Sequence, residues 1–379
     1  MEKGLSRERQ SGGAGLAGSP AAGEDSRLRA MQQAVQVRVP ATSANLGPGL
    51  DTLGMALELH NVVRVECGPL LPAPAGAAAA WERVEVRVQG FGEGILPQDD
   101  TNLVARSMAA VFSRCGLWPR WVRIEARNNV PVWGGLGSSA TAVVAGIWAA
   151  DALLPGVRVR PWLLSLASHL EGHPDNVAAA VHGGVVVAMA TDGPDASGGS
   201  CGEGQLGARG NLRNTDGNGL PEIRALPLSV PYPWDIVLLI PHLRVDTAAS
   251  RRRLPHQVPL ADAVFNVQRA AALVAALQNG RAADLQQAMR DRLHQPYRLP
   301  HIPGAEEASR AALTAGALGV CLSGSGPTLL AFCAGRSGQV AAAMNAAMRR
   351  AGVEAHTVLT RVAPEGVRVE PLACAPQGR

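Results

Sequence analysis

The feature that most constrains this chain is the stretch from 131 to 141, Pro-Val-Trp-Gly-Gly-Leu-Gly-Ser-Ser-Ala-Thr. It follows an alternating segment, 121–126, that predicts a strand, and it leads directly into an apolar run that predicts a buried helix. Glycines let the backbone turn tightly, and the unpaired N–H groups at the start of a helix attract anions. The order strand, glycine loop, helix therefore indicates a phosphate-binding loop, although an ordinary turn before a core helix has the same local pattern.

Lysine is almost absent, since Lys3 is the only one in the chain. This excludes phosphate loops that require a lysine, the lysine-dependent protein kinases and the Schiff-base enzymes. If the protein handles a nucleoside triphosphate, it uses backbone amides, a metal ion and arginine. A net charge of +4, with only 3% aromatic residues, also argues against a nucleic-acid-binding surface.

Length and composition indicate an ordinary globular chain. With 379 residues, 47% of them hydrophobic and 17% charged, it can build two domains with substantial cores. The six cysteines form no CxxC pair, which argues against a zinc site or a disulfide framework. We find no membrane-length apolar run and no secretory signal, so we expect a cytoplasmic protein without membrane contact.

The periodicity of the chain predicts an α+β sandwich in each half. Segments 61–67 and 83–88 read as antiparallel strands, and 161–170, 262–277, 283–294 and 306–315 read as helices. We predict a disordered N-terminal extension at 1–33, a first domain at 34–190 and a Gly-rich insertion or linker at 191–222. A second domain at 223–365 and a flexible tail at 366–379 follow.

Two polar stretches stand out beside the glycine loop. Residues 40–54 carry Thr42, Ser43, Asn45 and Asp51 among glycines and prolines, which is typical of a loop with converging hydrogen-bonding groups. The arginine triplet 251–253 reads either as a solvated face or as an anion-binding group.

A third polar stretch, Glu-Gly-His-Pro-Asp-Asn at 171–176, combines acidic, imidazole and amide groups. Gly172 and Pro174 would break a helix that placed His169 and His173 on one face, so a transition-metal site is disfavoured. A carboxylate that reaches Mg²⁺ fits better. Asp175 or Asn176 would also cap a helix that begins at Val177.

Together with a second glycine loop at 322–328, these segments resemble the three motifs of the GHMP kinase superfamily. The stretch PATSANLGPGLDTLGMAL resembles the homoserine kinase branch specifically, and the resemblance continues through EGHPDNVAAAVHGG, the TxxSRxxLP segment at 247–255, DAVFNVQRAAALVAAL, AMRDRLHQPYR and IPG. It covers roughly 35–362 without the insertions. It implies the two-domain GHMP kinase fold, with an N-terminal mixed or antiparallel βαβ-type sandwich and a C-terminal ferredoxin-like α/β sandwich.

The resemblance also implies an activity: transfer of the γ-phosphoryl group of ATP to the side-chain hydroxyl of L-homoserine, the entry to threonine. The ATP-binding loop would comprise Pro131, Val132, Trp133, Gly134, Gly135, Leu136, Gly137, Ser138, Ser139, Ala140 and Thr141. Ser138 or Ser139 would hold Mg²⁺ with Glu171. The acceptor would be bound by Asn45, Asp51, His173, Asp175, Thr247, Arg251 and Arg298, with Asp51 on its ammonium group and an arginine on its carboxylate. Asn176 matches an amide in the place where related kinases carry an aspartate base, so we expect no strong general base.

Two departures from the family pattern bear on this interpretation. Trp133 stands where the family usually has a small residue, and residues 191–221 are longer than expected. The alternatives are another small-molecule kinase of the superfamily that acts on mevalonate, a sugar or an isoprenoid precursor, a non-catalytic binding protein, and an RNA-binding module. A homodimer is left open.

Overall fold

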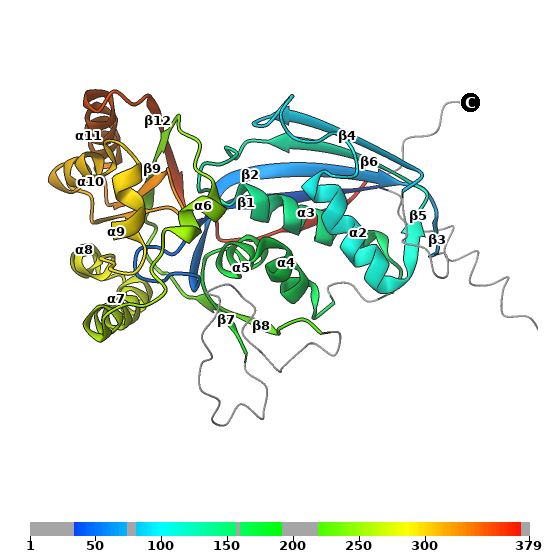
Figure 1. Cartoon of the computed structure of the whole chain (residues 1–379), viewed down its shortest axis with the longest axis horizontal. Coiled ribbons are helices and arrows are strands. Elements are labelled where there is room, and N and C mark those ends of the chain that lie inside the picture. Colours follow the sequence, from blue (N-terminus) through cyan, green and yellow to red (C-terminus); the bar gives the residue numbers. More distant parts are fainter. Residues whose placement is uncertain (1–33, 74–80, 157–159, 192–218, 373–379) are drawn as a thin grey trace, which may run out of the picture.

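The computed structural model describes residues 34–73, 81–156, 160–191 and 219–372 (Figure 1). The predicted extension at 1–33 and most of the predicted insertion, 192–218, lie outside the described residues. Within the described ranges, seven strands form the N-terminal sheet in the order β13-β1-β2-β6-β4, with β7 paired to β2 and β8 to β7. The strands are β1 (Ala34–Ala44), β2 (Leu53–Cys67), β4 (Arg83–Gly90), β6 (Trp121–Asn128), β7 (Val185–Ala190), β8 (Ile223–Leu228) and β13 (Arg368–Pro371), beside a separate pair, β3 (Leu70–Pro72) with β5 (Leu117–Pro119).

Four helices cover one face of this sheet (Figure 1). They are α2 (Leu103–Cys115), α3 (Ser138–Leu153), α4 (Leu163–Glu171) and α5 (Asp175–His182). The alternation in β1 sets the faces, because Val35, Val37 and Val39 are buried against the helices while Arg38 between them is exposed.

The C-terminal sheet is antiparallel, in the order β10-β11-β9-β12, and it has helices on both faces. Its strands are β9 (Asp235–Pro241), β10 (Gly319–Leu322), β11 (Leu329–Cys333) and β12 (Ala355–Arg361). Its helices are α6 (Thr247–Arg252), α7 (Leu260–Gln278), α8 (Leu285–Ala288), α9 (Gln295–Arg298), α10 (Ala305–Thr314) and α11 (Ser337–Arg350), with short 3₁₀ turns η1 (Ala282–Asp284) and η2 (Leu299–His301). On strand β9, Val237 and Leu239 pack against helices α10 and α11, whereas Ile236 and Leu238 pack against helices α7 and α8 on the opposite face.

One hydrophobic cluster joins the two halves. Leu53 and Leu136 of the N-terminal half pack in it with Leu238, Leu273 and Phe332 of the C-terminal half. Leu136 belongs to the glycine loop, so the same packing that joins the halves also fixes this loop against the second domain.

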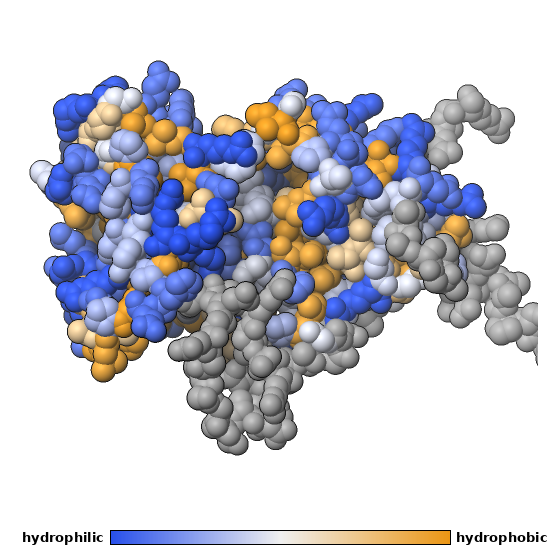
Figure 2. All heavy atoms as spheres, in the orientation of Figure 1, coloured by the Kyte–Doolittle hydropathy of each residue, from blue (hydrophilic) through white to orange (hydrophobic). Residues whose placement is uncertain are grey.

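Helix α7 leaves much of its apolar surface in contact with solvent. Leu260 is 78% exposed and Val267 is 70% exposed, and Figure 2 shows the hydrophobic surface at this edge of the molecule. Among the described helices it alone has the length and apolarity to cross a membrane. Leu273 and Leu277 nevertheless pack in the core, so α7 is part of the folded domain.

The structure corrects several predictions. Strands β8 and β13 belong to the N-terminal sheet, because their backbones pair with β7 and β1. The predicted boundary at 223 and the predicted flexibility of 366–372 are therefore wrong, while 373–379 lie outside the described residues. The predicted strands 61–67 and 83–88 are not neighbours, because β6 lies between them and β4 runs parallel to it.

The predicted helix 283–294 is only the short η1 and α8, after which the side chain of Asp291 binds the backbone instead. Helix α5 begins at Asp175, with Pro174 at its cap position, rather than at Val177.

Candidate functional site

A single cavity brings the three loops together. It is lined by residues from the first loop, the glycine loop, the α4–α5 turn, α6 and the second glycine loop. Of the predicted site residues it contains Asn45, Asp51, Val132, Trp133, Gly134, Gly135, Gly137, Ser138, Ser139, Thr141, Glu171, His173, Asp175, Asn176, Thr247, Arg251 and Arg298. Pro131, Leu136 and Ala140 are buried and do not line it; Leu136 packs in the cluster that joins the two halves, and Ala140 packs in the N-terminal core.

The glycine loop packs too tightly for side chains at two positions. A Cβ at Gly135 (φ +75°) would lie 2.5 Å from the carbonyl oxygen of Ser323, and one at Gly137 (φ +67°) would strike the hydroxyl of Thr42. Helix α3 then starts at Ser138 without a side-chain cap. Its first N–H groups therefore remain available to an anion, as the sequence pattern predicted.

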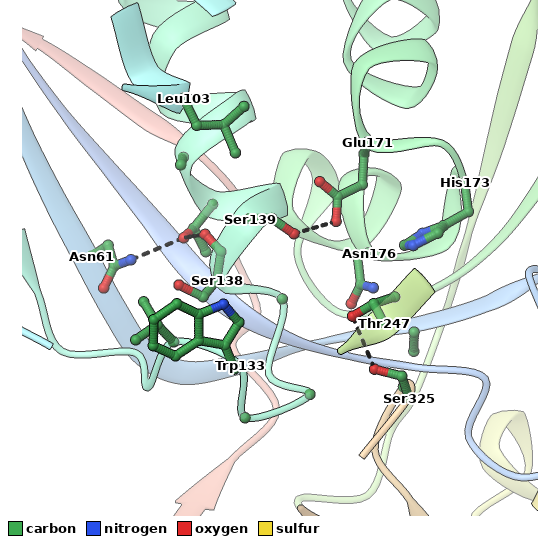
Figure 3. Close-up of a pocket in the computed structure, with 18 of the residues that line it drawn as sticks. Asn61, Leu103, Trp133, Ser138, Ser139, Glu171, His173, Asn176, Thr247 and Ser325 are labelled. Carbon is green, nitrogen blue, oxygen red and sulfur yellow. Dashed lines mark hydrogen bonds between the residues drawn. The ribbon is translucent and has the colours of Figure 1, made fainter. Parts of the chain in front are cut away.

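Ser139 and Glu171 form the hard-oxygen pair of the cavity. The Ser139 hydroxyl donates to Glu171 Oε1 at 2.6 Å, and the two side chains face each other in Figure 3. Burial raises the pKa of the Glu171 carboxyl, and His173 and the Ser139 bond offset this only in part. A desolvated carboxylate beside a hydroxyl fits Mg²⁺, which takes one or two protein oxygens and completes its shell with phosphates and water. No cluster of three or more His, Cys, Asp or Glu suited to a metal occurs within the described ranges.

Trp133 forms part of the cavity wall. Its φ is +59°, which is unusual for a bulky residue, and the guanidinium of Arg244 stacks on its ring 3.8 Å from the centroid. Arg244 lies just before α6, so this contact links the glycine loop to the element that carries Arg251. In Figure 3 the Trp133 ring lies next to Ser138 at the start of α3.

Asp51 and Arg251 pair with each other on the side of the cavity where the acceptor was predicted to bind, called the acceptor side below. The two guanidinium nitrogens donate to the two carboxylate oxygens at 2.9 and 2.6 Å. Burial alone would raise the pKa of Asp51, but the Arg251 bonds and charge hold it below its ordinary value. Asn45 Oδ1 accepts from the Asp51 N–H at 3.0 Å, and both residues have positive φ. Of the arginine triplet, Arg251 alone lines the cavity, while Arg252 and Arg253 are exposed.

Arg298 reaches the same region from α9. Its Nη1 donates to the carbonyl oxygen of Gly324 at 3.2 Å, and Asn45 Nδ2 donates to the same oxygen at 3.1 Å. The residue is 4% exposed, and its buried Nε has no hydrogen-bond partner among the described residues. An unpaired buried donor is costly, so this arginine is suited to an acceptor that a ligand brings.

His173, Asp175 and Asn176 follow Glu171 in the α4–α5 turn. Burial alone would lower the pKa of His173, but the charge and hydrogen bond of Asp175, with Glu171 nearby, raise it to about 9. His173 is therefore an imidazolium at neutral pH. Asn176 Oδ1 accepts from the hydroxyl of Thr42 at 2.8 Å, which fixes its amide at the first loop.

Sequence reasoning missed two parts of the site. The hydroxyl of Ser323 lies within hydrogen-bonding distance of both Ser43 Oγ (2.9 Å) and the carbonyl oxygen of Gly135 (2.7 Å), so the second glycine loop ties the other two together. The loop itself was predicted as a glycine motif, but none of its residues was assigned to the site. The other part is the section of the cavity wall that includes Val63, Leu96 and Leu103 together with the polar Asn61 and Asn102. No local pattern marks this wall, because its residues come from separate elements.

Comparison with known proteins matches both halves of this architecture. Residues 102–184 match the family model "GHMP kinases N terminal domain", and residues 273–350 match "GHMP kinases C terminal". The homoserine kinase of Moorella thermoacetica is 42% identical over 318 residues, which cover 84% of this chain and 94% of that relative. This chain is a homoserine kinase family member. The homoserine kinase of Carboxydothermus hydrogenoformans is 39% identical over 88% of the chain and 95% of its own length.

A solved structure of the homoserine kinase family shows the same fold. The homoserine kinase from Cytophaga hutchinsonii superposes with a TM-score of 0.71 at 27% identity, covering 90% of this chain and 98% of that one. The predicted two-domain α+β GHMP kinase fold and the family resemblance are thus confirmed, and membership of a kinase family implies ATP as a substrate.

Proposed function

We propose that this protein transfers the γ-phosphoryl group of ATP to the side-chain hydroxyl of L-homoserine and yields O-phospho-L-homoserine. The observation that carries the proposal is the arrangement of Asp51, Arg251 and Arg298 in the cavity that also contains the glycine loop. An amino-acid head group has one ammonium and one carboxylate. Asp51 can take the first, and an arginine can take the second through two parallel hydrogen bonds.

In the structure the Asp51 carboxylate and the Arg251 guanidinium pair with each other. We infer that the bound amino acid exchanges this pair for two new ones, Asp51 with the ammonium group and Arg251 or Arg298 with the carboxylate. After the exchange, Asp51 and the arginine that binds the carboxylate each still face an opposite charge, which keeps the desolvation cost low. Acceptors such as mevalonate have no ammonium group and would leave Asp51 without its partner.

On the ATP side, the N–H groups of the glycine loop and of the first turn of α3 hold the triphosphate. Ser139 and Glu171 would hold Mg²⁺, which when bound neutralises phosphate charge. The His173 imidazolium adds positive charge between the two substrates. Positioning and charge neutralisation are what phosphoryl transfer chiefly requires.

Asn176 occupies the place of a base but cannot accept a proton. Because its Oδ1 is engaged by Thr42, the amide offers its Nδ2 as a donor to the acceptor hydroxyl or to a phosphoryl oxygen. We therefore propose that the phosphoryl oxygens take the hydroxyl proton late in the transfer.

The experiment is an acceptor panel. Purified protein with Mg-ATP is given L-homoserine, mevalonate, galactose or shikimate, and ADP release is measured. We expect stimulation by L-homoserine alone. Stimulation by mevalonate or a sugar instead would favour another GHMP kinase activity, and no stimulation by any acceptor would favour a non-catalytic binding protein. The homodimer and the cytoplasmic location stay predictions.

A further inference from the structure

A buried histidine lies directly behind the acceptor side of the cavity. His294 is 0% exposed, and its Nε2 is 2.6 Å from the carbonyl oxygen of Gly47 in the first loop. Its Nδ1 is 3.3 Å from Nη1 of Arg298. A carbonyl oxygen only accepts and a guanidinium only donates, so these two partners select one state: the neutral imidazole with its proton on Nε2.

The backbone around His294 is fixed by Asp291, whose side chain is also 0% exposed. Asp291 Oδ2 accepts from the N–H groups of His294 at 3.0 Å and Gln295 at 2.6 Å. Its Oδ1 accepts from Asn266 Nδ2 at 2.8 Å, and the same Nδ2 lies 3.2 Å from the carbonyl oxygen of Pro48. Two consecutive carbonyl groups of the first loop thus accept hydrogen bonds from buried side chains: Gly47 from His294 and Pro48 from Asn266.

The first loop lies so close to this support that it has no room for a side chain at Gly47. The φ of Gly47 is +90°, and a Cβ there would strike the carbonyl oxygen of Met289. Asn45 and Asp51 flank the supported carbonyls on either side. A shift of the support would therefore move the acceptor-binding groups on both sides of it.

Arg298 depends on the same histidine. The Nη1 of Arg298 has two acceptors, Nδ1 of His294 and the carbonyl oxygen of Gly324, and they fix the plane of the guanidinium. The buried Nε of Arg298 has no hydrogen-bond partner in the part of the chain that the structure describes. The charged groups that face the imidazole are Asp291, Arg298 and Asp51. Burial, with Arg298 close by, holds the pKa of His294 below its ordinary value, so the accepting Nδ1 lone pair persists at neutral pH.

We propose that His294, held by Asp291, is a positioning residue for the amino-acid acceptor: it orients Arg298 toward the acceptor carboxylate and fixes the loop that carries Asn45 and Asp51. The inference rests on the proposed function, because it assigns the carboxylate to Arg298. It makes His294 matter for the acceptor and not for ATP, whose loop lies on the other side of the cavity. A change in the KM for L-homoserine alone would distinguish this role from plain core packing, which would change the KM values for both substrates or for neither.

The test compares His294→Leu and His294→Gln with a matched control, His301→Gln, at an exposed position. Leu removes both hydrogen bonds, whereas the Gln amide can still donate to Gly47. We expect His294→Leu to raise the KM for L-homoserine roughly tenfold or more, as loss of a bond to a charged group does. The KM for ATP should stay within about twofold. His294→Gln should recover part of the loss, and His301→Gln should behave as wild type.

A second acceptor separates the two roles. L-homoserine amide has no carboxylate, so its KM should respond to His294→Leu much less than the KM for L-homoserine. If His294→Leu does not fold, the variants Arg298→Lys, His294→Gln and the double variant give the same information. If the two residues act together, the effect of the double variant on the KM for L-homoserine should be smaller than the sum of the two single effects, expressed as free energies. Equal losses for both acceptors, a matching rise in the KM for ATP, or strict additivity would overturn the inference. Failure of wild type to phosphorylate L-homoserine would instead refute the proposed function.

Discussion

Replacing Asp51 by Asn is the most direct perturbation of the acceptor side. The amide has the shape of the carboxylate, and Asn tolerates the positive φ of 55° at this position, so the loop should keep its fold. The substitution removes one negative charge from a carboxylate that Arg251 keeps ionised at neutral pH. It therefore tests whether this charge is what the acceptor's ammonium group binds.

The structure sets the size of the effect. Hydrogen bonds between charged groups contribute about 1.5–3 kcal/mol when they are well shielded. The side chains of Asp51 and Arg251 are 37% and 27% exposed, so water screens part of this. We expect a loss of about 2 kcal/mol in the transition-state complex, which is roughly a 30-fold fall in kcat/KM for L-homoserine.

The assay measures initial rates with L-homoserine and with 4-hydroxybutyrate, which has the same hydroxyl and carboxylate but no ammonium group. For wild type the second acceptor should be much poorer. For Asp51→Asn its kcat/KM should change by less than about threefold, because the missing charge has no partner on it. The same fold loss on both acceptors, or an unchanged kcat/KM for L-homoserine, would refute the assignment of Asp51 to the ammonium group.

Four further substitutions test the other parts of the site. Glu171→Gln should lower kcat on the order of a hundredfold and raise the Mg²⁺ concentration needed for half-maximal rate, while the KM for L-homoserine stays within twofold; wild-type activity would contradict the metal role. Asn176→Asp should not raise turnover, and a substantial increase would show that a carboxylate base is useful there after all. Trp133→Ala should raise the KM for ATP roughly three- to thirtyfold, because the ring and its contact with Arg244 form the wall of the site; an unchanged KM would mean that Trp133 only shields the loop. His294→Gln should flatten the pH dependence of stability below neutrality. The pKa of His294 in the folded state lies below the unfolded value of about 6.5, so the unfolded chain binds a proton that the folded chain does not. Wild type therefore loses stability as the pH falls through about 6.5, and the variant lacks this loss. Parallel stability curves for the two proteins, measured by chemical unfolding at several pH values, would contradict this.

Some parts of the site are encoded locally. The glycine loop, the uncapped start of α3 and the polar loop at 40–54 follow from preferences of the backbone over a few residues, namely positive φ at glycine and unpaired N–H groups at a helix start. These preferences act without the rest of the chain, so both loops could be placed from the sequence. The same holds for the break after Glu171, where Gly172 and Pro174 prevent a continuous helix.

Errors arose where long-range pairing overrides local pattern. The alternating Val-Arg-Val-Glu at 367–370 is too short to predict a strand with assurance, and β13 forms because the edge of β1 offers unpaired backbone groups. The segment 283–294 has helical periodicity, but the Asp291 side chain takes the N–H groups of residues 293–295 and ends any helix there.

The sequence by itself predicted the fold family and the position of the glycine loop, and it supplied the set of polar residue types around the cavity. The family resemblance had already selected Arg251 from the three adjacent arginines, but only the tertiary structure shows why Arg251 alone lines the cavity, because that depends on how α6 packs. The tertiary structure also decided that Arg251 meets Asp51 from 200 positions away, that Arg244 covers Trp133, and that a buried histidine supports Arg298. Such contacts depend on distance in space and on burial, and a one-dimensional pattern contains neither.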